Sequence, residues 1–335
     1  MIEPESRVLV IAVARIGDTV LATPVLRALA AAIPRGRLDV IVQANRAGLL
    51  EGLPYVGRIV GARKLGLAVA RLAGRRYDYA FVYGRDGWLV RHALAVARRV
   101  IAFRQPEAGL NERLYRAVEP PTGPIHAVRE RALLLEAVGV PMPDPRAEYR
   151  VAPAEAAEAG RFIARAFARR PHPLLALAPK SFPTKAYRDW PQERFVALLD
   201  RLFRERPAAG AVVLGDAGAR DVAEALGARF PGRVAAAAGA RSLRESAALM
   251  AACDLYVGVD TGPTHLAGAL GLPMVALYHC RHRGRHLAPL GHPALEVIEH
   301  PAADADCAET TPMAAIDADT VWQAVARRLA AAEAA

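Results

Sequence analysis

The sequence predicts an α/β protein made of two doubly wound halves, each a parallel sheet covered by helices on both faces. Short apolar runs alternate with amphipathic helical segments along the whole chain, which is typical of βαβ units. The 335 residues exceed the roughly 250–300 that one hydrophobic core usually holds, so we expect two domains. No run of about 18 apolar residues occurs, so no transmembrane helix is expected.

The first half opens with a βαβ unit. Residues 7–13 form an apolar run expected to be a strand buried on both faces. Residues 19–32 have apolar side chains at helical spacing, Pro34 ends this helix, and residues 38–42 form the next strand. No Gly-x-Gly-x-x-Gly lies between the first strand and helix, which argues against a nicotinamide or flavin dehydrogenase.

The remaining elements continue the alternation. In the first half we expect strands at residues 79–83, 99–103 and 149–151, an irregular loop at 105–125, and helices at 126–138 and 154–169. In the second half we expect strands at residues 174–178, 211–214, 234–238, 255–259 and 274–278.

A proline-rich stretch, residues 170–173, marks the expected domain boundary. The prediction is a first domain of residues 1–170, a second of residues 171–318, and a C-terminal helix at 319–335 that packs back on the first domain. The carboxyl edges of two such sheets are expected to face each other across a cleft that holds the active site.

The strongest candidate for a ligand site is the turn Asp-Thr-Gly-Pro at residues 260–263. It follows a predicted strand and precedes a short predicted helix, residues 264–270. Such a turn places backbone N–H groups and the positive end of a helix dipole at the carboxyl edge of a sheet, where anions bind. An ordinary capped βα turn has the same pattern, and the turn alone does not separate the two interpretations.

Asp18 lies where the first strand ends and the first helix begins. A carboxylate at this place either caps the helix or serves as a general base at the carboxyl edge of the sheet. The two roles are compatible in one side chain.

The chain is basic, with a net charge of +10 and a pI near 10.0. Residues 63–104 contain ten Lys or Arg against two Asp, a local excess of eight positive charges. This excess fits either solvated helix faces or a basic surface for a polyanionic acceptor or an anionic membrane. No aromatic interleaving, recognition helix or zinc finger accompanies it, so no nucleic-acid partner is expected.

The three cysteines are Cys253, Cys280 and Cys307, and they lack the spacing of a metal or disulfide framework. We therefore expect inert thiols and no metal site. The acidic, polar N-terminus does not resemble a signal peptide, so a cytoplasmic location is expected. The basic charge of the chain also suggests contact with the cytoplasmic face of the inner membrane.

Three segments together resemble glycosyltransferase family 9, the heptosyltransferases of lipopolysaccharide synthesis and their relatives. They are Arg15-Ile-Gly-Asp-Thr-Val-Leu-Ala-Thr-Pro, Pro179-Lys-Ser-Phe-Pro-Thr-Lys with Trp190-Pro-Gln-Glu-Arg-Phe, and Val259-Asp-Thr-Gly-Pro-Thr-His-Leu-Ala-Gly. The resemblance covers nearly the whole chain in the right order. It implies a GT-B fold of two Rossmann-like domains, an inverting mechanism without a metal ion, and ADP-heptose as the usual donor and co-substrate, with no cofactor.

The resemblance also assigns residues. Asp18 matches the base that takes the proton of the acceptor hydroxyl. The positions matched to the donor side are Thr261, Gly262 and Pro263 in the diphosphate loop, Asp260 and His265 beside them, the cation Lys185, and, more loosely, Asp216 and Asp221 for the ribose. Within the basic N-terminal half, the candidates for acceptor binding are Arg15, Arg63, Lys64 and Arg85.

The chain departs from the family pattern at two places. The usual Lys-x-Trp-Pro spacing is stretched between Lys185 and Trp190, so Lys180 is an alternative to Lys185. Residues 279–286 contain three arginines and three histidines where the family usually has Gly-Pro-Thr and a proline-rich loop. This segment either binds the diphosphate or an acidic sugar, or is a solvated loop.

The expected function is transfer of a heptose, or a related sugar, from an ADP-sugar to a lipopolysaccharide-core or other glycan acceptor. The alternatives are a transferase with another nucleotide sugar and a small soluble acceptor, a sugar-nucleotide epimerase, and a non-enzymatic module that binds nucleotide sugar. The acceptor, the linkage and the oligomeric state do not follow from the sequence.

Overall fold

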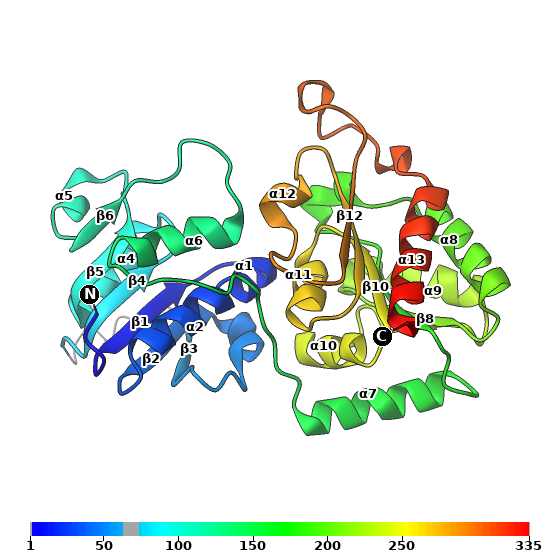
Figure 1. The fold of residues 1–335 in the computed structure, drawn as a ribbon, viewed down its shortest axis with the longest axis horizontal. Coiled ribbons are helices and arrows are strands. Elements are labelled where there is room, and N and C mark those ends of the chain that lie inside the picture. The colour runs from blue at the N-terminus through cyan, green and yellow to red at the C-terminus, as the bar shows by residue number, and fades with distance from the viewer. Residues whose placement is uncertain (1, 63–73, 335) are drawn as a thin grey trace. The chain divides into compact units, whose positions relative to one another are not determined.

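The computed structural model describes residues 2–62 and 74–334. Contacts within the chain divide it into two compact units, the first ending at Arg150 and the second beginning at Val151. Each unit is a sheet with helices on both faces (Figure 1).

In the first unit the described residues form a six-stranded parallel sheet in the order β3-β2-β1-β4-β5-β6. Its strands are β1 (Arg7–Ala12), β2 (Arg37–Gln43), β3 (Ile59–Ala62), β4 (Tyr77–Val82), β5 (Ala97–Phe103) and β6 (Arg116–Val118). Its helices are α1 (Ile16–Val20), α2 (Thr23–Ala32), α4 (Gly87–Val96), α5 (Ala108–Asn111) and α6 (Ala127–Glu136), with a 3-10 helix, η1 (Ala44–Leu50).

In the second unit the described residues again form a six-stranded parallel sheet, in the order β12-β11-β10-β7-β8-β9. Its strands are β7 (Leu174–Ala178), β8 (Gly210–Val213), β9 (Val234–Ala236), β10 (Leu255–Val259), β11 (Met274–Tyr278) and β12 (Leu295–Glu299). Its helices are α7 (Pro153–Ala166), α8 (Gln192–Glu205), α9 (Arg220–Arg229), α10 (Leu243–Ala251), α11 (Gly262–Ala269), α12 (Gly284–Leu287) and α13 (Ala318–Glu333). Short 3-10 helices are η2 (Pro183–Arg188), η3 (Ala217–Ala219), η4 (Asp304–Asp306) and η5 (Met313–Ala315).

The central strands are apolar throughout because both faces of each sheet are covered. In β1, Val8 and Val10 pack into one core with α2, while Leu9 and Ile11 pack into a second core with α4. Successive side chains of a strand point to opposite faces, so a strand between two helical layers needs apolar residues at every position. The predicted α/β class with two doubly wound, Rossmann-like halves is confirmed.

Two predicted elements differ from the structure, and two further strands were not predicted. Residues 149–151, expected to be a strand, have no regular secondary structure and lead into α7. The expected loop at 105–125 contains α5 and β6. The strands β3 and β12 were not predicted, because β3 has only four residues and the apolar side chains of β12 are interrupted by Glu296.

The boundary lies at a different place from the one predicted at Arg170. Helix α7 packs against α10 of the second unit, where Arg244 of α10 forms a salt bridge with Glu155 of α7. The guanidinium of Arg241 also lies 4.4 Å from the ring centroid of Phe162 in α7. These contacts place α7 with the second sheet.

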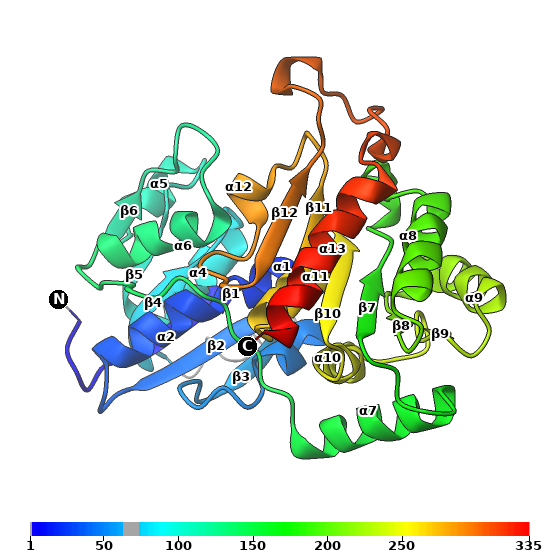
Figure 2. The same ribbon diagram turned by 45° about the vertical axis from the view of Figure 1, so that its right-hand side comes forward.

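Helix α13 also belongs to the second unit, where it packs against α8 and beside β10 and β11 (Figures 1 and 2). The indole N–H of Trp190 donates a hydrogen bond of 2.8 Å to the carbonyl oxygen of Ile316, just before α13. The helix was predicted to pack on the first domain, and the structure shows it packed on the second.

Candidate active site

Each sheet reverses its strand order between two central strands, which are β1 and β4 in the first unit and β7 and β10 in the second. In open parallel sheets, ligands bind beyond the carboxyl ends of the strands at such a reversal. The loop after β1 leads to Asp18, and the loop after β4 carries Arg85. The loop after β7 carries Lys180, and the turn after β10 begins at Asp260. The predicted base candidate and the predicted donor residues named here thus follow the carboxyl ends of central strands.

The turn after β10 is built around a buried carboxylate. Asp260 is 2% exposed, and its Oδ2 accepts a hydrogen bond of 2.7 Å from Nη1 of Arg188. His265 Nε2 lies 3.9 Å from the other carboxylate oxygen. Burial raises the pKa of Asp260 to about 6, and the charge of Arg188 opposes this rise. A buried carboxylate with one arginine partner fixes the turn.

Helix α11 starts directly at this turn. Thr261 is its N-cap residue, Gly262 its first residue, and Pro263 occupies the first turn, where a missing N–H has no consequence. Thr264 is fully buried, and its hydroxyl donates a hydrogen bond to the carbonyl of Val259, which ties the helix to β10. Backbone N–H groups in the first turn of a helix have no acceptor within the helix, so this helix start provides donors for an anion.

Three cations lie near the turn, and each has an acidic partner. Lys180 pairs with Asp189 at 3.1 Å, and Lys185 pairs with Glu309 at 3.4 Å. Arg188 is the cation that binds Asp260 of the predicted diphosphate turn.

Arg188 was missed by the sequence reasoning. The signal was present, because Arg188-Asp189-Trp190-Pro191 has the spacing of the family's Lys-x-Trp-Pro with arginine in place of lysine. The apparent stretch between Lys185 and Trp190 therefore disappears when Arg188 is taken as the matching residue.

The aromatic ring of Tyr187 lies beside this group of cations. Its hydroxyl is 2.7 Å from Nε2 of His282, and Lys185 Nζ lies 5.3 Å from its ring centroid. Burial, together with the charges of Arg188 and Lys185, lowers the pKa of His282 to about 4. His282 is therefore neutral at physiological pH in the ligand-free protein.

Asp216 and Asp221 lie beyond β8, next to β7 in the sheet. Asp216 caps η3 by accepting a hydrogen bond of 2.9 Å from the backbone N–H of Gly218. Asp221 is exposed in the first turn of α9. The capping role of Asp216 is structural, and the predicted ribose contacts of both residues stay predictions.

In the first unit, Asp18 lies in the first turn of α1 and is not its N-cap, which is Arg15. The carboxylate of Asp18 accepts a hydrogen bond of 2.7 Å from Nη2 of Arg131 in α6. Arg131 was not predicted, since it is 113 residues away in the sequence. It orients the carboxylate that the sequence identified as the base.

The predicted acceptor residues are only partly described. Arg85 is exposed in the loop between β4 and α4, and Arg15 precedes α1. Arg63 and Lys64 lie outside the residues that the structure describes.

The basic stretch is partly neutralised by acidic residues outside it in the sequence. Arg91 pairs with Glu107, Arg99 with Glu3 at 3.0 Å, and Arg104 with Glu119. The local excess of positive charge counted along the sequence therefore overstates the charge of the folded surface.

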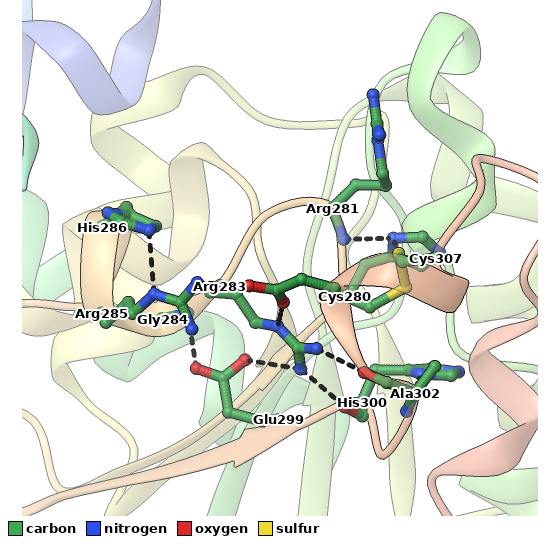
Figure 3. A network of polar contacts seen from close by, with 12 residues as sticks. Cys280, Arg281, Arg283, Gly284, Arg285, His286, Glu299, His300, Ala302 and Cys307 are labelled. Carbon is green, nitrogen blue, oxygen red and sulfur yellow. Dashed lines mark hydrogen bonds and ion pairs between the residues drawn. A yellow bond between two sulfur atoms is a disulfide. The ribbon is translucent and has the colours of Figure 1, made fainter. Parts of the chain in front are cut away.

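Residues 279–286 are not a solvated loop. Arg283 is 9% exposed, donates to the carbonyl oxygen of His300 at 2.7 Å, and pairs with Asp304 at 2.9 Å (Figure 3). Arg285 pairs with Asp304 at 2.7 Å. Two of the three arginines thus fasten the loop to the segment after β12.

A disulfide joins Cys280 to Cys307 (Figure 3). The expectation of inert thiols is therefore wrong for these two cysteines, and it missed the pair because 27 residues separate them and no spacing rule connects them. Cys253 is a buried free cysteine whose pKa burial raises well above its ordinary value, so its thiol is inert as expected.

In the part of the chain that the structure describes, no helix combines the length and the apolar character needed to span a bilayer.

Comparison with solved structures identifies the fold. A glycosyltransferase of family 9 from Veillonella parvula superposes with a TM-score of 0.86 at 18% identity, covering 98% of this chain and 99% of that one. The ADP-heptose lps heptosyltransferase II of E. coli superposes with a TM-score of 0.79 at 21% identity, covering 98% and 99%. The two-domain arrangement of sheets is thus the GT-B fold of these glycosyltransferases.

The family follows from the sequence itself. Residues 75–316 match the model of glycosyltransferase family 9 (heptosyltransferase), and the chain belongs to this family. It is also 28% identical over 294 residues to lipopolysaccharide heptosyltransferase 1 of Pseudomonas aeruginosa, covering 81% of this chain and 78% of that protein. The chain is a glycosyltransferase.

Proposed function

We propose that the protein transfers a heptose, or a closely related sugar, from an ADP-sugar to a lipopolysaccharide-core or other glycan acceptor. The names of the Pseudomonas and E. coli relatives support this choice of donor and acceptor. The observation that carries the proposal is the diphosphate-type turn at Asp260, where the N-terminus of α11 and the guanidinium of Arg188 meet at the carboxyl end of β10.

The proposed reaction is a single displacement with inversion at the anomeric carbon. Asp18 takes the proton of the acceptor hydroxyl, whose oxygen forms the new glycosidic bond while the bond from the anomeric carbon to the diphosphate breaks. ADP leaves with the bonding electron pair. Because Asp18 is held by Arg131, proton transfer to Asp18 has to compete with this ion pair.

The leaving diphosphate needs stabilisation as its charge develops. We propose that the backbone N–H groups at Gly262 and the start of α11, with the hydroxyl of Thr261, bind it. Arg188 is the cation already in place at this turn, and Lys185 and Lys180 lie on the same loop. With these groups the transfer step requires no metal ion in this proposal.

The donor is tested by thermal unfolding of the full chain with ADP-, GDP-, UDP- and dTDP-sugars. A ligand at about 100 times its dissociation constant adds ~2.7 kcal/mol to the native state. ADP-heptose is expected to raise the melting temperature more than the other nucleotide sugars. Stabilisation by none of them would remove the donor-site argument.

The base is tested with Asp18→Asn in a transfer assay that follows ADP release. Loss of a general base lowers turnover about 100- to 10,000-fold, whereas donor binding by thermal shift is expected to stay unchanged. Asp86→Asn is the matched control, because Asp86 is an exposed N-cap of α4 in the neighbouring loop and asparagine caps equally well. Turnover by Asp18→Asn near that of the control would exclude Asp18 as the base.

We also propose that the acceptor is anionic and reached at the cytoplasmic face of the inner membrane. The exposed Arg85 and the net charge of +10 support an anionic partner. Sedimentation with anionic and with neutral vesicles tests the membrane contact, which should weaken steeply as the salt concentration rises.

A further inference from the structure

Three side chains near the disulfide carry the ligand atoms that soft and borderline metal ions prefer. The imidazole of His279 and the sulfur atoms of Cys280 and Cys307 all lie within 4.8 Å of one another. His279 is 0% exposed and Cys280 is 4% exposed, while Cys307 is half-buried. Among the residues that the structure describes, this is the one such group of His, Cys, Asp or Glu side chains.

The hydrogen bonds of His279 define which ring nitrogen is available. Its Nε2 lies 2.9 Å from the carbonyl oxygen of Thr311, and because a carbonyl only accepts, Nε2 carries the proton. Its Nδ1 therefore has the lone pair, accepts the backbone N–H of Arg281 at 3.1 Å, and lies 3.8 Å from the sulfur of Cys280. A histidine that donates one N–H to a backbone carbonyl and turns its other nitrogen to sulfur has the orientation of a metal ligand.

The two cysteines lie on segments that other contacts also hold together. Cys280 follows β11, and Cys307 lies in the connection between β12 and α13, residues 300–317. The contacts between these segments include the His279–Thr311 bond and the ion pair of Arg283 with Asp304. Arg283 also donates to the carbonyl oxygen of His300 (Figure 3). None of these contacts involves sulfur, so reduction of the disulfide leaves the two thiols side by side.

We propose that, when the disulfide is reduced, His279, Cys280 and Cys307 form a zinc site. The ligand set is one imidazole nitrogen and two thiolates, with a water molecule as the fourth ligand of a tetrahedral ion. Two thiolates balance the charge of Zn²⁺, so the site as a whole stays neutral beside the buried Cys280 and the half-buried Cys307. Zinc binding at Nδ1 of His279 replaces the hydrogen bond from the backbone N–H of Arg281, because Nδ1 has a single lone pair.

The chemistry is a two-electron exchange followed by proton release. A phosphine or dithiol reductant supplies two electrons, the S–S bond breaks, and each sulfur takes one proton; a phosphine is converted to its oxide with oxygen from water. Zinc binding then releases the two thiol protons. The disulfide and the zinc site exclude each other, because the S–S bond removes both thiolates. The disulfide and the zinc site would each cross-link the segment after β11 to the segment between β12 and α13. The proposed zinc site does not depend on the glycosyl transfer proposed above.

The experiment uses the full chain in two forms, air-oxidised and reduced with a phosphine under anaerobic conditions, each then desalted and titrated with Co²⁺ and Zn²⁺. The reduced protein is expected to bind one Co²⁺ with thiolate-to-cobalt charge-transfer absorption and tetrahedral d–d bands, and one equivalent of Zn²⁺ should bleach them. The oxidised protein should show neither band. This comparison needs no variant, so it stands even where a substitution prevents folding.

Variants then identify the ligands. Cys280→Ser and Cys307→Ser should each abolish the charge-transfer band, and His279→Asn should weaken metal binding at least 10-fold while its amide oxygen still accepts from Arg281. The matched controls are Cys253→Ser, the remaining cysteine, and His286→Asn, on the same loop, and both should bind as the wild type does. No band in the reduced wild type, an equal band in the oxidised protein, or retention of the band in Cys280→Ser would overturn the proposal.

Discussion

The ion pair between Arg188 and Asp260 makes a quantitative prediction about stability. The side chains are 13% and 2% exposed, and Arg188→Met removes the cation while keeping a long apolar side chain. Removing one partner of a buried pair leaves a buried charge and costs about 3–5 kcal/mol. We expect a loss of this size in the free energy of unfolding at pH 8.

The loss should depend on pH. The pKa of Asp260 is about 6 in the folded wild type, against the ordinary 3.8, and removal of Arg188 raises it further. A carboxyl whose pKa is higher in the folded state stabilises that state at low pH, and this stabilisation is lost as pH rises through the folded pKa. At pH 5 Asp260 is largely protonated in the folded wild type and in folded Arg188→Met, so the part of the stability loss that comes from a buried, unpaired charge vanishes. Above pH 6 the loss grows by up to ~1.4 kcal/mol per pH unit.

The assay is guanidinium unfolding of the ligand-free protein at pH 5 and pH 8, followed by tryptophan fluorescence, to which buried Trp190 and Trp322 contribute in the second unit. Adding Asp260→Asn to Arg188→Met should remove the pH dependence. Arg229→Met is the control, because its pair with Asp200 at 3.5 Å is largely exposed and worth under about 1 kcal/mol. An equal loss at both pH values, or a loss at pH 8 no larger than that of the control, would refute the reasoning.

Three further predictions concern packing, the disulfide and the base. Gly268→Ala should destabilise the protein by about 1–3 kcal/mol, because the added Cβ would overlap the ring of Pro289. Gly160 is exposed in α7 and an added Cβ would meet nothing within 4 Å, so Gly160→Ala should stabilise the protein by about 0.5–1 kcal/mol. Chemical denaturation measures both changes. Reduction of the disulfide in metal-free buffer should lower the free energy of unfolding by about 3–4 kcal/mol, because the unfolded chain regains the conformational entropy that a closed loop of 27 residues removes. An unchanged free energy of unfolding in the presence of reductant would contradict this. Arg131→Met should lower kcat without weakening donor binding by thermal shift, and a parallel loss of donor binding would show that Arg131 does more than orient Asp18.

The elements that the sequence predicted best are those whose signal is local. Strands β1, β7, β10 and β11 are continuous apolar runs because both faces are covered, and all four were predicted. The edge strands β3 and β6 were missed, because a half-buried strand of three or four residues is too short to show a periodic pattern.

The parts of the candidate site that could be predicted are the residues whose place follows from the order of strands and helices along the chain. Asp260 comes directly after a central strand, and Asp18 lies at the start of the helix that follows one, so their place at the carboxyl edge of a sheet followed from the alternation of elements. The partners Arg131 and Arg188 lie 113 and 72 residues from the carboxylates that they bind, and only the fold brings them together. The Cys280–Cys307 pair was missed for the same reason, because sequence separation hides a contact between neighbouring loops.

The two sheets have the same strand order when the second is read from its opposite edge. The loop after β1 is thus the counterpart of the loop after β7, and the loop after β4 is the counterpart of the turn after β10. Asp18 and Lys180 follow counterpart strands in the two halves, as do Arg85 and Asp260. One topology used twice therefore gives each half a binding edge of the same kind, and in the proposed reaction the edge of the first half supplies a base while that of the second binds an anion.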